Sequence, residues 1–446
     1  MPDKLLVIIE SPGKIQKVSQ YLKDLGYDAI VKASMGHIRE LADAGKCNRG
    51  FDLEDAKVQS HWQVNSGKKK NVEDIRKLTK GRTVVLATDG DREGESISWH
   101  LAEVLKLKSP QRMVYQEITK DAIGRALKQL RPLDMGLVGA ALARARLDKD
   151  VGYCGTQLVV WPLNIGARSM GRVQTAALAI ATERERQIRT FKPQNYYSLS
   201  VDYAEGFKAF YRATRSQPAP AGSATEEDVA RDDAQESGED KQSESDRITS
   251  QQEAERIVAI ARQNPHQVIT VEQKQAFQRP PEPFTTSTLQ QAAGTRFKYR
   301  PDKTMELAQK LYEGGFITYM RTDSVALAET FCASVRKYLE QTDPKNVPQK
   351  TAQFRNKAGA QEAHEAVRPT DITQTPEKLK GQLPDEQLSL YALIWQRTLA
   401  TQCAPAELNK GRVVVQAGST TWEARGQTVV YAGYTRYTNS LNTSYR

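Results

Sequence analysis

The chain has little cysteine, and its cysteines are not arranged to hold a zinc ion. It contains 446 residues and only four cysteines, with no CxxC pair among them. They lie far apart, at Cys47, Cys154, Cys332 and Cys403. Closely spaced cysteine pairs are typical of zinc ribbons, and dense cysteine frameworks belong to small secreted domains. The cysteine content therefore favours a reduced, cytoplasmic protein.

Long apolar runs and a nucleotide-binding P-loop are also missing. No stretch approaches the roughly 18 consecutive apolar residues that a membrane helix needs. The start Met1-Pro2-Asp3 does not resemble a signal peptide. The pattern G-x-x-x-x-G-K-[ST], which would cradle the phosphates of ATP, does not occur. From these absences we expect no membrane partner and no ATP chemistry of the P-loop type. The length of the chain predicts three or four domains.

The charge of the chain is unevenly distributed. The formal net charge is +10, yet residues 216–247 carry ten acidic and three basic side chains, a net of −7, which leaves +17 for the remainder. A basic body of this kind favours a polyanionic partner such as nucleic acid, although a merely solvated basic surface is the alternative. The acidic segment is Ser-rich and nearly free of large apolar residues, which predicts a disordered insertion over 216–250.

Two apolar runs predict parallel strands that end in functional residues. Residues 4–9 are rich in branched side chains, as in a buried parallel strand, and Glu10 ends the run. Ser11-Pro12 predicts a helix start with Lys14 in its first turn, where backbone N–H groups favour a phosphate. A second run, 83–88, leads into an acidic loop. Open α/β sheets bind ligands at the carboxyl ends of their strands, so we expect a site there.

The acidic loop reads Asp89-Gly90-Asp91-Arg92-Glu93-Gly94-Glu95, and we expect a helix over 96–107 after it. Asp89, Asp91 and Glu93 alternate, so an extended backbone would point their carboxylates in one direction. Clustered carboxylates repel unless a cation holds them, and hard oxygen ligands suit Mg²⁺. A calcium EF-hand is excluded, because its final glutamate is absent and a strand leads into the loop. A solvated acidic turn is the alternative.

The segment 316–324 places a tyrosine in a polar setting. It follows a helical pattern, 303–312, that a pair of glycines closes, and Tyr319 is followed by Arg321-Thr322-Asp323. A tyrosine hydroxyl titrates near 10, so a nucleophilic tyrosine needs cationic help, which Arg321 can supply while its planar fork binds a phosphate. The alternative is a half-buried aromatic residue in a short strand.

The acidic triad, the Tyr319 segment and a loop that reads His-Glu-Ala-Val-Arg-Pro-Thr over 364–370 together resemble the type IA DNA topoisomerases, in particular their bacterial topoisomerase I branch. The resemblance runs from Glu-Ser-Pro-Gly-Lys at 10–14 to Ala-Arg-Gly-Gln at 424–427. It covers nearly the whole chain apart from the acidic insertion and the last dozen residues. The single histidine before Glu365 is similar to topoisomerase I rather than topoisomerase III.

The resemblance implies a multidomain α/β and α+β fold that forms an incomplete ring around DNA. The implied parts are a Rossmann-like Toprim domain (1–140), the first part of a winged-helix-like DNA-binding domain (141–195), the first leg of a β-rich arch with the insertion (196–278), a helical domain bearing the tyrosine (279–405), and a truncated second leg of the arch (406–446). The rest of the family core would lie beyond Arg446. We accordingly expect this chain alone to bind single-stranded DNA weakly and to need the remainder for relaxation.

The resemblance also implies the chemistry and its residues. Tyr319 would attack a phosphodiester of single-stranded DNA and form a 5′-phosphotyrosyl link, after which a strand passes and the 3′-hydroxyl reseals the break. Arg321, Lys14 and His364 would hold the phosphate, and Glu10 would exchange a proton with the 3′-oxygen. Mg²⁺ would be held by Asp89, Asp91, Glu93 and Glu10. The DNA backbone would be contacted by His37, Arg144, Arg146, Lys149, Ser169, Met170, Gly171, Arg172, Val173, Gln174, Thr322 and Asp323.

The implied protein is a cytoplasmic, nucleoid-associated monomer that acts on single-stranded and negatively supercoiled DNA without ATP. Two other functions remain open at this point. A Toprim primase or nuclease would share Glu10 and the acidic triad but would have no use for the Tyr319 segment. A DNA-binding fragment with little or no relaxation activity is the second alternative.

Overall fold

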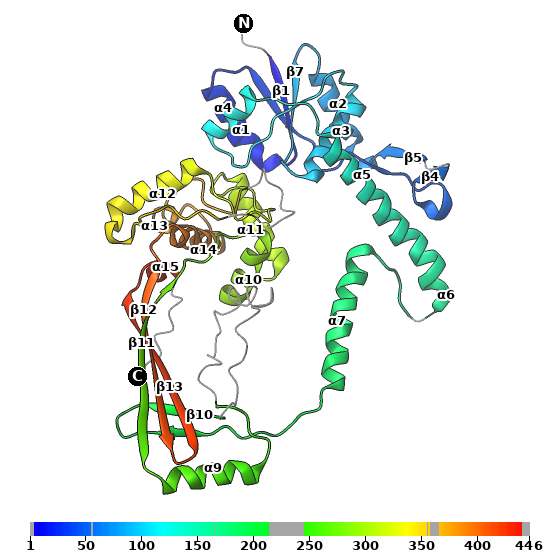
Figure 1. Cartoon of the computed structure of the whole chain (residues 1–446). Helices are drawn as coiled ribbons and strands as arrows, with labels where there is room; N and C mark the ends of the chain where they lie inside the picture. The colour runs from blue at the N-terminus through cyan, green and yellow to red at the C-terminus, as the bar shows by residue number, and fades with distance from the viewer. Residues whose placement is uncertain are drawn as a thin grey trace. The chain divides into compact units, whose positions relative to one another are not determined.

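The structure is a computed structural model that describes residues 4–54, 57–164, 166–213, 245–354, 356 and 365–438. It divides into two compact units (Figure 1). The first comprises Met1–Phe191 and Glu306–Met320, and the second comprises Lys192–Met305 and Arg321–Arg446. Within the described ranges, no helix is both long enough and apolar enough to cross a membrane.

A four-stranded parallel sheet forms the core of the first unit. Its strand order is β2-β1-β7-β8, and the strands are β1 (Leu5–Ile9), β2 (Ala29–Ala33), β7 (Thr83–Ala87) and β8 (Gln111–Arg112). Every residue of β1 is buried, as expected for a strand covered on both faces. The central strands β1 and β7 pair in register up to Ile9 and Ala87, so the chain leaves both at the same sheet edge.

Helices cover both faces of this sheet (Figure 1). Leu6 and Ile8 of β1 share a core cluster with residues of α2 (Lys69–Leu78) and α3 (Arg92–Leu105). Side chains alternate along a strand, so the opposite face is left to α1 (Ile15–Asp24) and α4 (Lys120–Lys128), which contact each other. Short elements complete this part: η1 (Pro12–Lys14), η2 (Lys46–Asn48), η3 (Ser66–Lys68), and the pairs β3 (Arg39–Leu41) with β6 (Trp62–Val64) and β4 (Phe51–Glu54) with β5 (Lys57–Ser60).

A helical arm follows the sheet. Its elements are α5 (Met135–Lys149), the π-helical turns η4 (Asp150–Cys154) and η5 (Thr156–Val160), α6 (Trp161–Leu163) and α7 (Arg172–Thr190). α5 packs against α3, whereas α7 has no buried residue. The first unit also takes in the C-terminal part of α11 (Pro301–Glu313) and the segment up to Met320. The glycine pair that closes α11 includes Gly315 at φ +70°, as the sequence predicts for a helix end.

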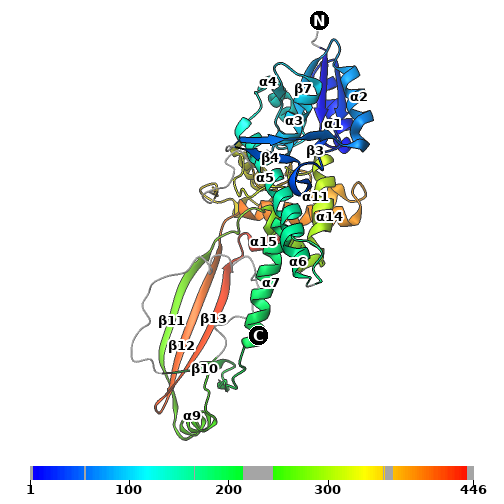
Figure 2. The same cartoon turned by 90° about the vertical axis from the view of Figure 1, so that its right-hand side faces the viewer.

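A five-stranded antiparallel sheet dominates the second unit. Its order is β11-β12-β13-β10-β9, with strands β9 (Ser200–Asp202), β10 (Lys208–Arg212), β11 (His266–Gln278), β12 (Ala406–Ala417) and β13 (Thr420–Tyr431). Figure 2 shows the three long strands side by side. α9 (Gln251–Gln263) packs on the sheet, because Ala254 and Ile257 share a core cluster with Val415 and Trp422.

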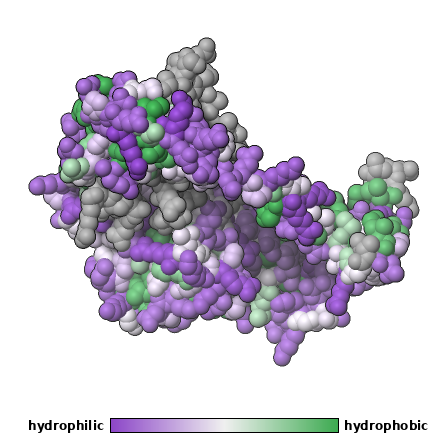
Figure 3. Space-filling model, turned by 90° about the horizontal axis from the view of Figure 1, so that it is seen from below, coloured by the Kyte–Doolittle hydropathy of each residue, from purple (hydrophilic) through white to green (hydrophobic). Residues whose placement is uncertain are grey.

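The rest of the second unit is helical. Its elements are α10 (Thr286–Phe297), the N-terminal part of α11, α12 (Glu329–Thr342), η8 (Pro344–Asn346), α13 (Pro376–Leu379), α14 (Asp385–Thr401) and α15 (Thr435–Thr438). Thr285 caps α10 by accepting a hydrogen bond from the backbone N–H of Thr288, as its Thr/Ser-rich sequence predicts. The face of the molecule drawn in Figure 3 is mostly hydrophilic, with only small hydrophobic areas.

Two expectations about secondary structure are wrong. The helix after the acidic loop begins at Arg92 rather than at residue 96. The alternating sequence after Gly411 predicts short strands, but β12 and β13 are long paired strands of 12 residues each, and α15 follows them. Continuous pairing of β12 with both neighbours carries the strand through Gly411, which sequence alone marks as a break. The insertion 216–250 lies mostly outside the described residues.

Candidate active site

Two loops meet at the carboxyl ends of β1 and β7. The first begins at Glu10 and continues into η1, where the Ser11 hydroxyl accepts a hydrogen bond from Gly13 N at 3.3 Å and Pro12 occupies the first turn. Lys14 ends this turn, and its side chain is completely buried. Lys14 forms an ion pair with Asp89 from the second loop, which is also buried. The structure thus brings together two residues that the sequence singled out separately.

The acidic loop is not extended along its whole length, which corrects the premise behind its alternating pattern. Because α3 begins at Arg92, Asp91 is its N-cap and Glu93 lies in its first turn. Asp91 Oδ1 accepts a hydrogen bond from Gly94 N at 2.8 Å. Glu93 Oε1 lies 3.1 Å from His37 Nε2. The positive end of the α3 dipole stabilises acidic side chains in this turn.

Glycine at position 94 lets the loop fold back tightly. A Cβ at this position would overlap the backbone of Asp89, so a larger residue would force the loop apart. The hydroxyl of Thr88 donates a hydrogen bond to the Gly94 carbonyl at 2.5 Å and lies 2.7 Å from the hydroxyl of Ser98. These contacts fix the path of the chain from β7 into α3.

This arrangement strongly perturbs the carboxyl of Glu10. Burial raises the pKa of its carboxyl, and the negative charge of Asp89 raises it further. Lys14 opposes this shift, while Asp91 and Glu93 add to it, and the resulting pKa is about 7. Glu10 therefore exchanges its proton in the neutral range, which suits a general acid or base.

The carboxylates of this site have the right chemistry for Mg²⁺. Asp89, Asp91 and Glu93 lie close enough to Glu10 to raise its pKa, and such repulsion is relieved by a hard cation. In the described part of the chain, however, no three His, Cys, Asp or Glu side chains converge in a geometry that could hold a metal. Three of these carboxylates already have partners: Asp89 pairs with Lys14, Asp91 accepts from Gly94 N, and Glu93 lies next to His37. The donor set fits Mg²⁺, and binding would require these contacts to rearrange.

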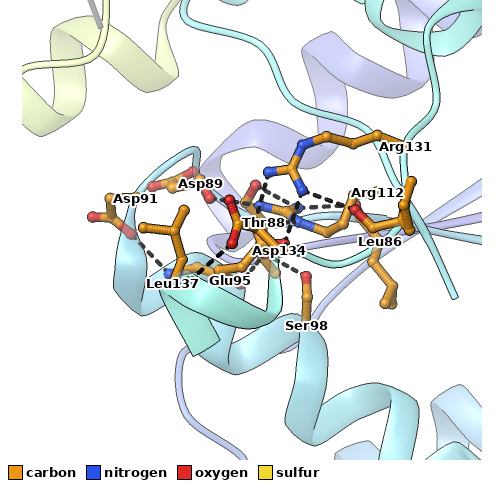
Figure 4. Close-up of polar contacts among 12 residues, drawn as sticks. Leu86, Thr88, Asp89, Asp91, Glu95, Ser98, Arg112, Arg131, Asp134 and Leu137 are labelled. Atoms are coloured by element: carbon orange, nitrogen blue, oxygen red, sulfur yellow. Dashed lines mark hydrogen bonds and ion pairs between the residues drawn. The ribbon is translucent and has the colours of Figure 1, made fainter. Parts of the chain in front are cut away.

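A buried arginine that sequence reasoning missed supports the acidic loop. Arg112 is completely buried and donates hydrogen bonds to the carbonyls of Leu86 (3.0 Å), Thr88 (3.0 Å) and Asp89 (2.9 Å) (Figure 4). Its Nε also donates to Glu95 Oε2 at 3.0 Å. Arg112 therefore fixes the backbone at Asp89. No sequence signal marks it, because three of its four acceptors are carbonyls of a distant strand end.

Glu95 connects this arginine to the start of α5. Its carboxylate accepts hydrogen bonds from Arg131 and from the backbone N–H of Asp134 at 2.7 Å (Figure 4). Asp134 is the N-cap of α5. The paired arginines hold the pKa of the Glu95 carboxyl below its usual value against the opposing effect of its burial, which is the largest single influence.

Tyr319 lies at the same sheet edge and is buried, with 4% of its surface exposed. Its hydroxyl donates a hydrogen bond to Asp91 Oδ2 at 2.7 Å, and its backbone N–H donates to the carbonyl of Gln116 at 2.8 Å. Lys17 donates to the carbonyl of Gly314, which holds the preceding turn. The structure thus places the predicted nucleophile directly on the acidic loop, a contact that sequence spacing alone does not give.

The residues from Arg321 onward belong to the second unit. Arg321 and Asp323 are exposed, whereas Thr322 is buried. At the start of α10, Thr286 N donates to the Thr322 carbonyl at 2.9 Å, and Thr322 N donates to Thr286 Oγ1 at 2.9 Å. Thr322 Oγ1 also accepts from the N–H of Ser324 at 3.0 Å. His364 lies outside the described residues.

The predicted DNA-contacting side chains of the helical arm are mostly engaged with neighbours. Asp148 accepts from Arg172 Nε at 2.6 Å and lies 3.7 Å from Arg144 Nε. The Arg172 hydrogen bond is the main cause of the lowered pKa of the Asp148 carboxyl. Lys149 pairs with Asp43 at 2.7 Å. The remaining contacts are Arg146 Nε to Ser60 Oγ (2.8 Å), Met170 N to Thr156 Oγ1 (3.1 Å), Gly171 N to Thr175 Oγ1 (3.3 Å) and Gln174 Nε2 to Ser169 Oγ (3.5 Å), and Val173 is exposed.

The fold and the site together define a class of protein with a cluster of acidic side chains at the carboxyl edge of a parallel sheet. A family model described as a Toprim domain matches residues 5–125. A second, described as DNA topoisomerase, matches residues 132–445. The chain therefore belongs to the type IA DNA topoisomerase family, and the Toprim domain and mixed fold class predicted from the sequence are confirmed.

Individual relatives agree with this assignment. The chain is 36% identical to DNA topoisomerase 1 of Vibrio cholerae and 34% identical to DNA topoisomerase 1 of Escherichia coli, in each case over 98% of this chain and 51% of the relative. The chain thus spans about half the length of these curated relatives. A structure of full-length topoisomerase I from Thermotoga maritima matches with a TM-score of 0.80 and 31% identity, over 99% of this chain and 68% of that one.

Proposed function

We propose that the protein relaxes negatively supercoiled DNA by cutting one strand through Tyr319, passing a strand through the break and resealing it. The observation that carries this proposal is the hydrogen bond from the Tyr319 hydroxyl to Asp91, which joins the nucleophile to the acidic loop. Membership of the topoisomerase family supports the reaction type. The relatives named DNA topoisomerase 1 support it as well.

The covalent step is a phosphoryl transfer in which the protein supplies the nucleophile, protons and charge. The Tyr319 oxygen attacks the phosphorus, the bond to the 3′-oxygen breaks, and a 5′-phosphotyrosyl link forms. Asp91 accepts the hydrogen bond of the attacking hydroxyl and is placed to receive its proton. Glu10, with a pKa of about 7, is protonated in part at neutral pH and can give a proton to the leaving 3′-oxygen.

Positive charge at the phosphate comes from Lys14 and Arg321, with His364 as a further candidate. A phosphoryl transfer depends mainly on such positioning and charge neutralisation. Lys14 has to exchange Asp89 for a phosphate oxygen when DNA enters. Toprim domains generally bind Mg²⁺, and here Glu10, Asp89, Asp91 and Glu93 would hold it. Bound Mg²⁺ would neutralise these carboxylates beside the DNA phosphate.

The proposed reaction takes its energy from the supercoiling of the DNA rather than from ATP. The proposed partner is single-stranded or negatively supercoiled DNA. We propose that the protein acts as a monomer in the cytoplasm, in association with the nucleoid. Sequence-independent backbone contacts are assigned to His37, Thr322, Asp323, the basic residues of α5 and the start of α7, because phosphate contacts set affinity rather than sequence preference.

A covalent adduct tests the proposal. A single-stranded oligonucleotide labelled near its 3′-end is incubated with the chain and Mg²⁺, and transfer of the label to protein is followed on a denaturing gel. We expect an adduct with the wild-type chain and none with Tyr319→Phe, while both bind the oligonucleotide equally. Tyr391→Phe is the matched control, because Tyr391 is equally buried but belongs to α14.

The same assay separates the alternatives. A Toprim nuclease or primase would yield free products without a label on the protein. A DNA-binding fragment would retain the oligonucleotide without cutting it. An adduct of normal yield from Tyr319→Phe would remove Tyr319 from the mechanism.

A further inference from the structure

A second tyrosine lies next to the nucleophile and has no assigned role. Tyr312 occupies the last turn of α11, and none of its surface is exposed. Its ring meets the ring of Tyr319 edge to face, with centroids 5.2 Å apart at an interplanar angle of 64°. The ammonium of Lys14 lies 4.7 Å from the centroid of the Tyr312 ring. One side chain therefore contacts both the nucleophile and the lysine assigned to the phosphate.

The ammonium of Lys14 is held by its neighbours. Asp89 pairs with it, and the ammonium also lies over the face of the Tyr312 ring. Lys14 and Tyr312 are 0% exposed and Asp89 is 7% exposed. Removing an ammonium from water is costly unless its charge is compensated, and an aromatic face attracts a cation most strongly where water is excluded. Without the ring, the flexible four-carbon chain of Lys14 would lose one of the contacts that hold its ammonium.

The hydroxyl of Tyr312 contributes nothing to these contacts. It has no hydrogen-bond partner within the described part of the chain. Burial, with Asp89 as the next cause, raises the pKa of this hydroxyl far above its usual value, so it stays neutral. The ring is therefore the functional part of the side chain, and a phenylalanine preserves it.

We propose that Tyr312 is a positioning residue whose ring holds the Lys14 ammonium at the cleavage site, ready to transfer from Asp89 to the DNA phosphate. This inference rests on the proposed function of Lys14 and Tyr319. In this role Tyr312 differs from a residue that only fills the core, because its effect on cleavage depends on the Lys14 ammonium.

The first test compares Tyr312→Phe and Tyr312→Leu in the adduct assay. Tyr312→Leu removes the ring, and misplacing a charged group at a reacting phosphate slows adduct formation by about tenfold to a hundredfold, with little change in oligonucleotide binding. Tyr312→Phe retains the ring and should match wild type. A buried-aromatic control, Tyr391→Leu, should also match wild type, which separates the effect from general destabilisation. Equal rates for Tyr312→Leu and wild type would overturn the proposal.

A double-mutant cycle shows whether the effect passes through Lys14. In a Lys14→Gln background the ring has no ammonium to hold, so adding Tyr312→Leu should slow adduct formation no further. If the two losses multiply, Tyr312 acts independently of Lys14 and the proposal is wrong.

A measurement without DNA keeps this inference distinct from the proposed function. Acetylation of lysines by an N-hydroxysuccinimide ester is mapped by mass spectrometry, with exposed Lys128 as the internal reference. Lys14 should resist acetylation in wild type and Tyr312→Phe and react faster in Tyr312→Leu. Unchanged protection in Tyr312→Leu would overturn the positioning role even if adducts form. If wild type forms no adduct but the protection depends on the ring, the positioning role is supported and the proposed cleavage function fails.

Discussion

The chemistry of the candidate site arises from a few side chains whose properties are set by their neighbours. Glu10 is an ordinary glutamate in sequence, yet burial and Asp89 raise its pKa to about 7. Lys14 is an ordinary lysine, yet it is buried against Asp89 and an aromatic ring. Sequence reasoning identified both residues from their place after a strand, but it could not give the contacts that tune them.

Glu10 predicts a pH dependence of stability. Its pKa rises from 4.5 to about 7 on folding, so the folded state binds its proton more tightly than the unfolded state. The stabilising contribution is complete below pH 4.5 and is lost as the pH rises through 7. Glu10→Gln keeps a neutral side chain at every pH. Thermal unfolding should therefore show wild type losing stability relative to Glu10→Gln between pH 5 and 8, in the absence of divalent cations. Parallel curves would show that Glu10 titrates normally.

Arg112 predicts a large loss of stability from a single substitution. Arg112→Leu leaves Glu95 with fewer partners and takes one donor away from each of three strand-end carbonyls, although the Leu86 carbonyl still accepts from Met113 N. Breaking a buried pair from one side typically costs about 3–5 kcal/mol. Arg125→Leu, at an exposed position of α4, should change stability by less than about 0.5 kcal/mol. Urea unfolding measures both. A small effect of Arg112→Leu would mean that the acidic loop does not depend on this support.

At the scale of elements, the buried strands were predictable and the loop between β7 and α3 was not. β1 and β7 match their apolar runs to within one residue at each end, because burial on both faces leaves a continuous signal. The start of α3 was missed because Gly94 resembles a loop residue, whereas here it permits close packing on Asp89. The contact of Tyr319 with Asp91 joins positions 228 residues apart, and no local pattern encodes it.

Asp91 has two tasks that substitutions can separate. It caps α3 through Gly94 N and accepts the hydrogen bond of the Tyr319 hydroxyl. Asparagine is as good a cap as aspartate, so Asp91→Asn should change stability little but should slow adduct formation, because a neutral amide is a poor proton acceptor. Asp91→Ala should slow the reaction similarly and also lose about 1 kcal/mol of stability. Adduct yield and urea unfolding of both variants test this, and normal cleavage by Asp91→Asn would exclude proton transfer to Asp91.

At the scale of the whole chain, the distribution of charge governs binding to DNA. The segment 216–247 carries −7 within a chain of net charge +10. Its composition indicates no packed core, and the proposed chemistry uses none of its residues. We propose that it weakens DNA binding without taking part in cleavage.

Replacing residues 216–247 by a Gly/Ser linker should leave the adduct rate unchanged and tighten binding to a single-stranded oligonucleotide at low salt. The gain should fade as salt rises, because it is electrostatic. A control of the same length with every Asp and Glu of the segment changed to Asn or Gln should reproduce the tighter binding. Loss of cleavage in either variant would show that the segment has a direct role.

Glu95 gives the acidic loop a remote reporter. Its carboxylate accepts the amide proton of Asp134 at the start of α5 and, through Arg112, is joined to the backbone of Asp89. The exchange of the Asp134 amide proton with deuterated solvent therefore depends on whether the loop keeps its hydrogen bonds with Arg112. A substrate or cation that displaces Asp89 should therefore change the hydrogen-exchange rate of the Asp134 amide at the start of α5.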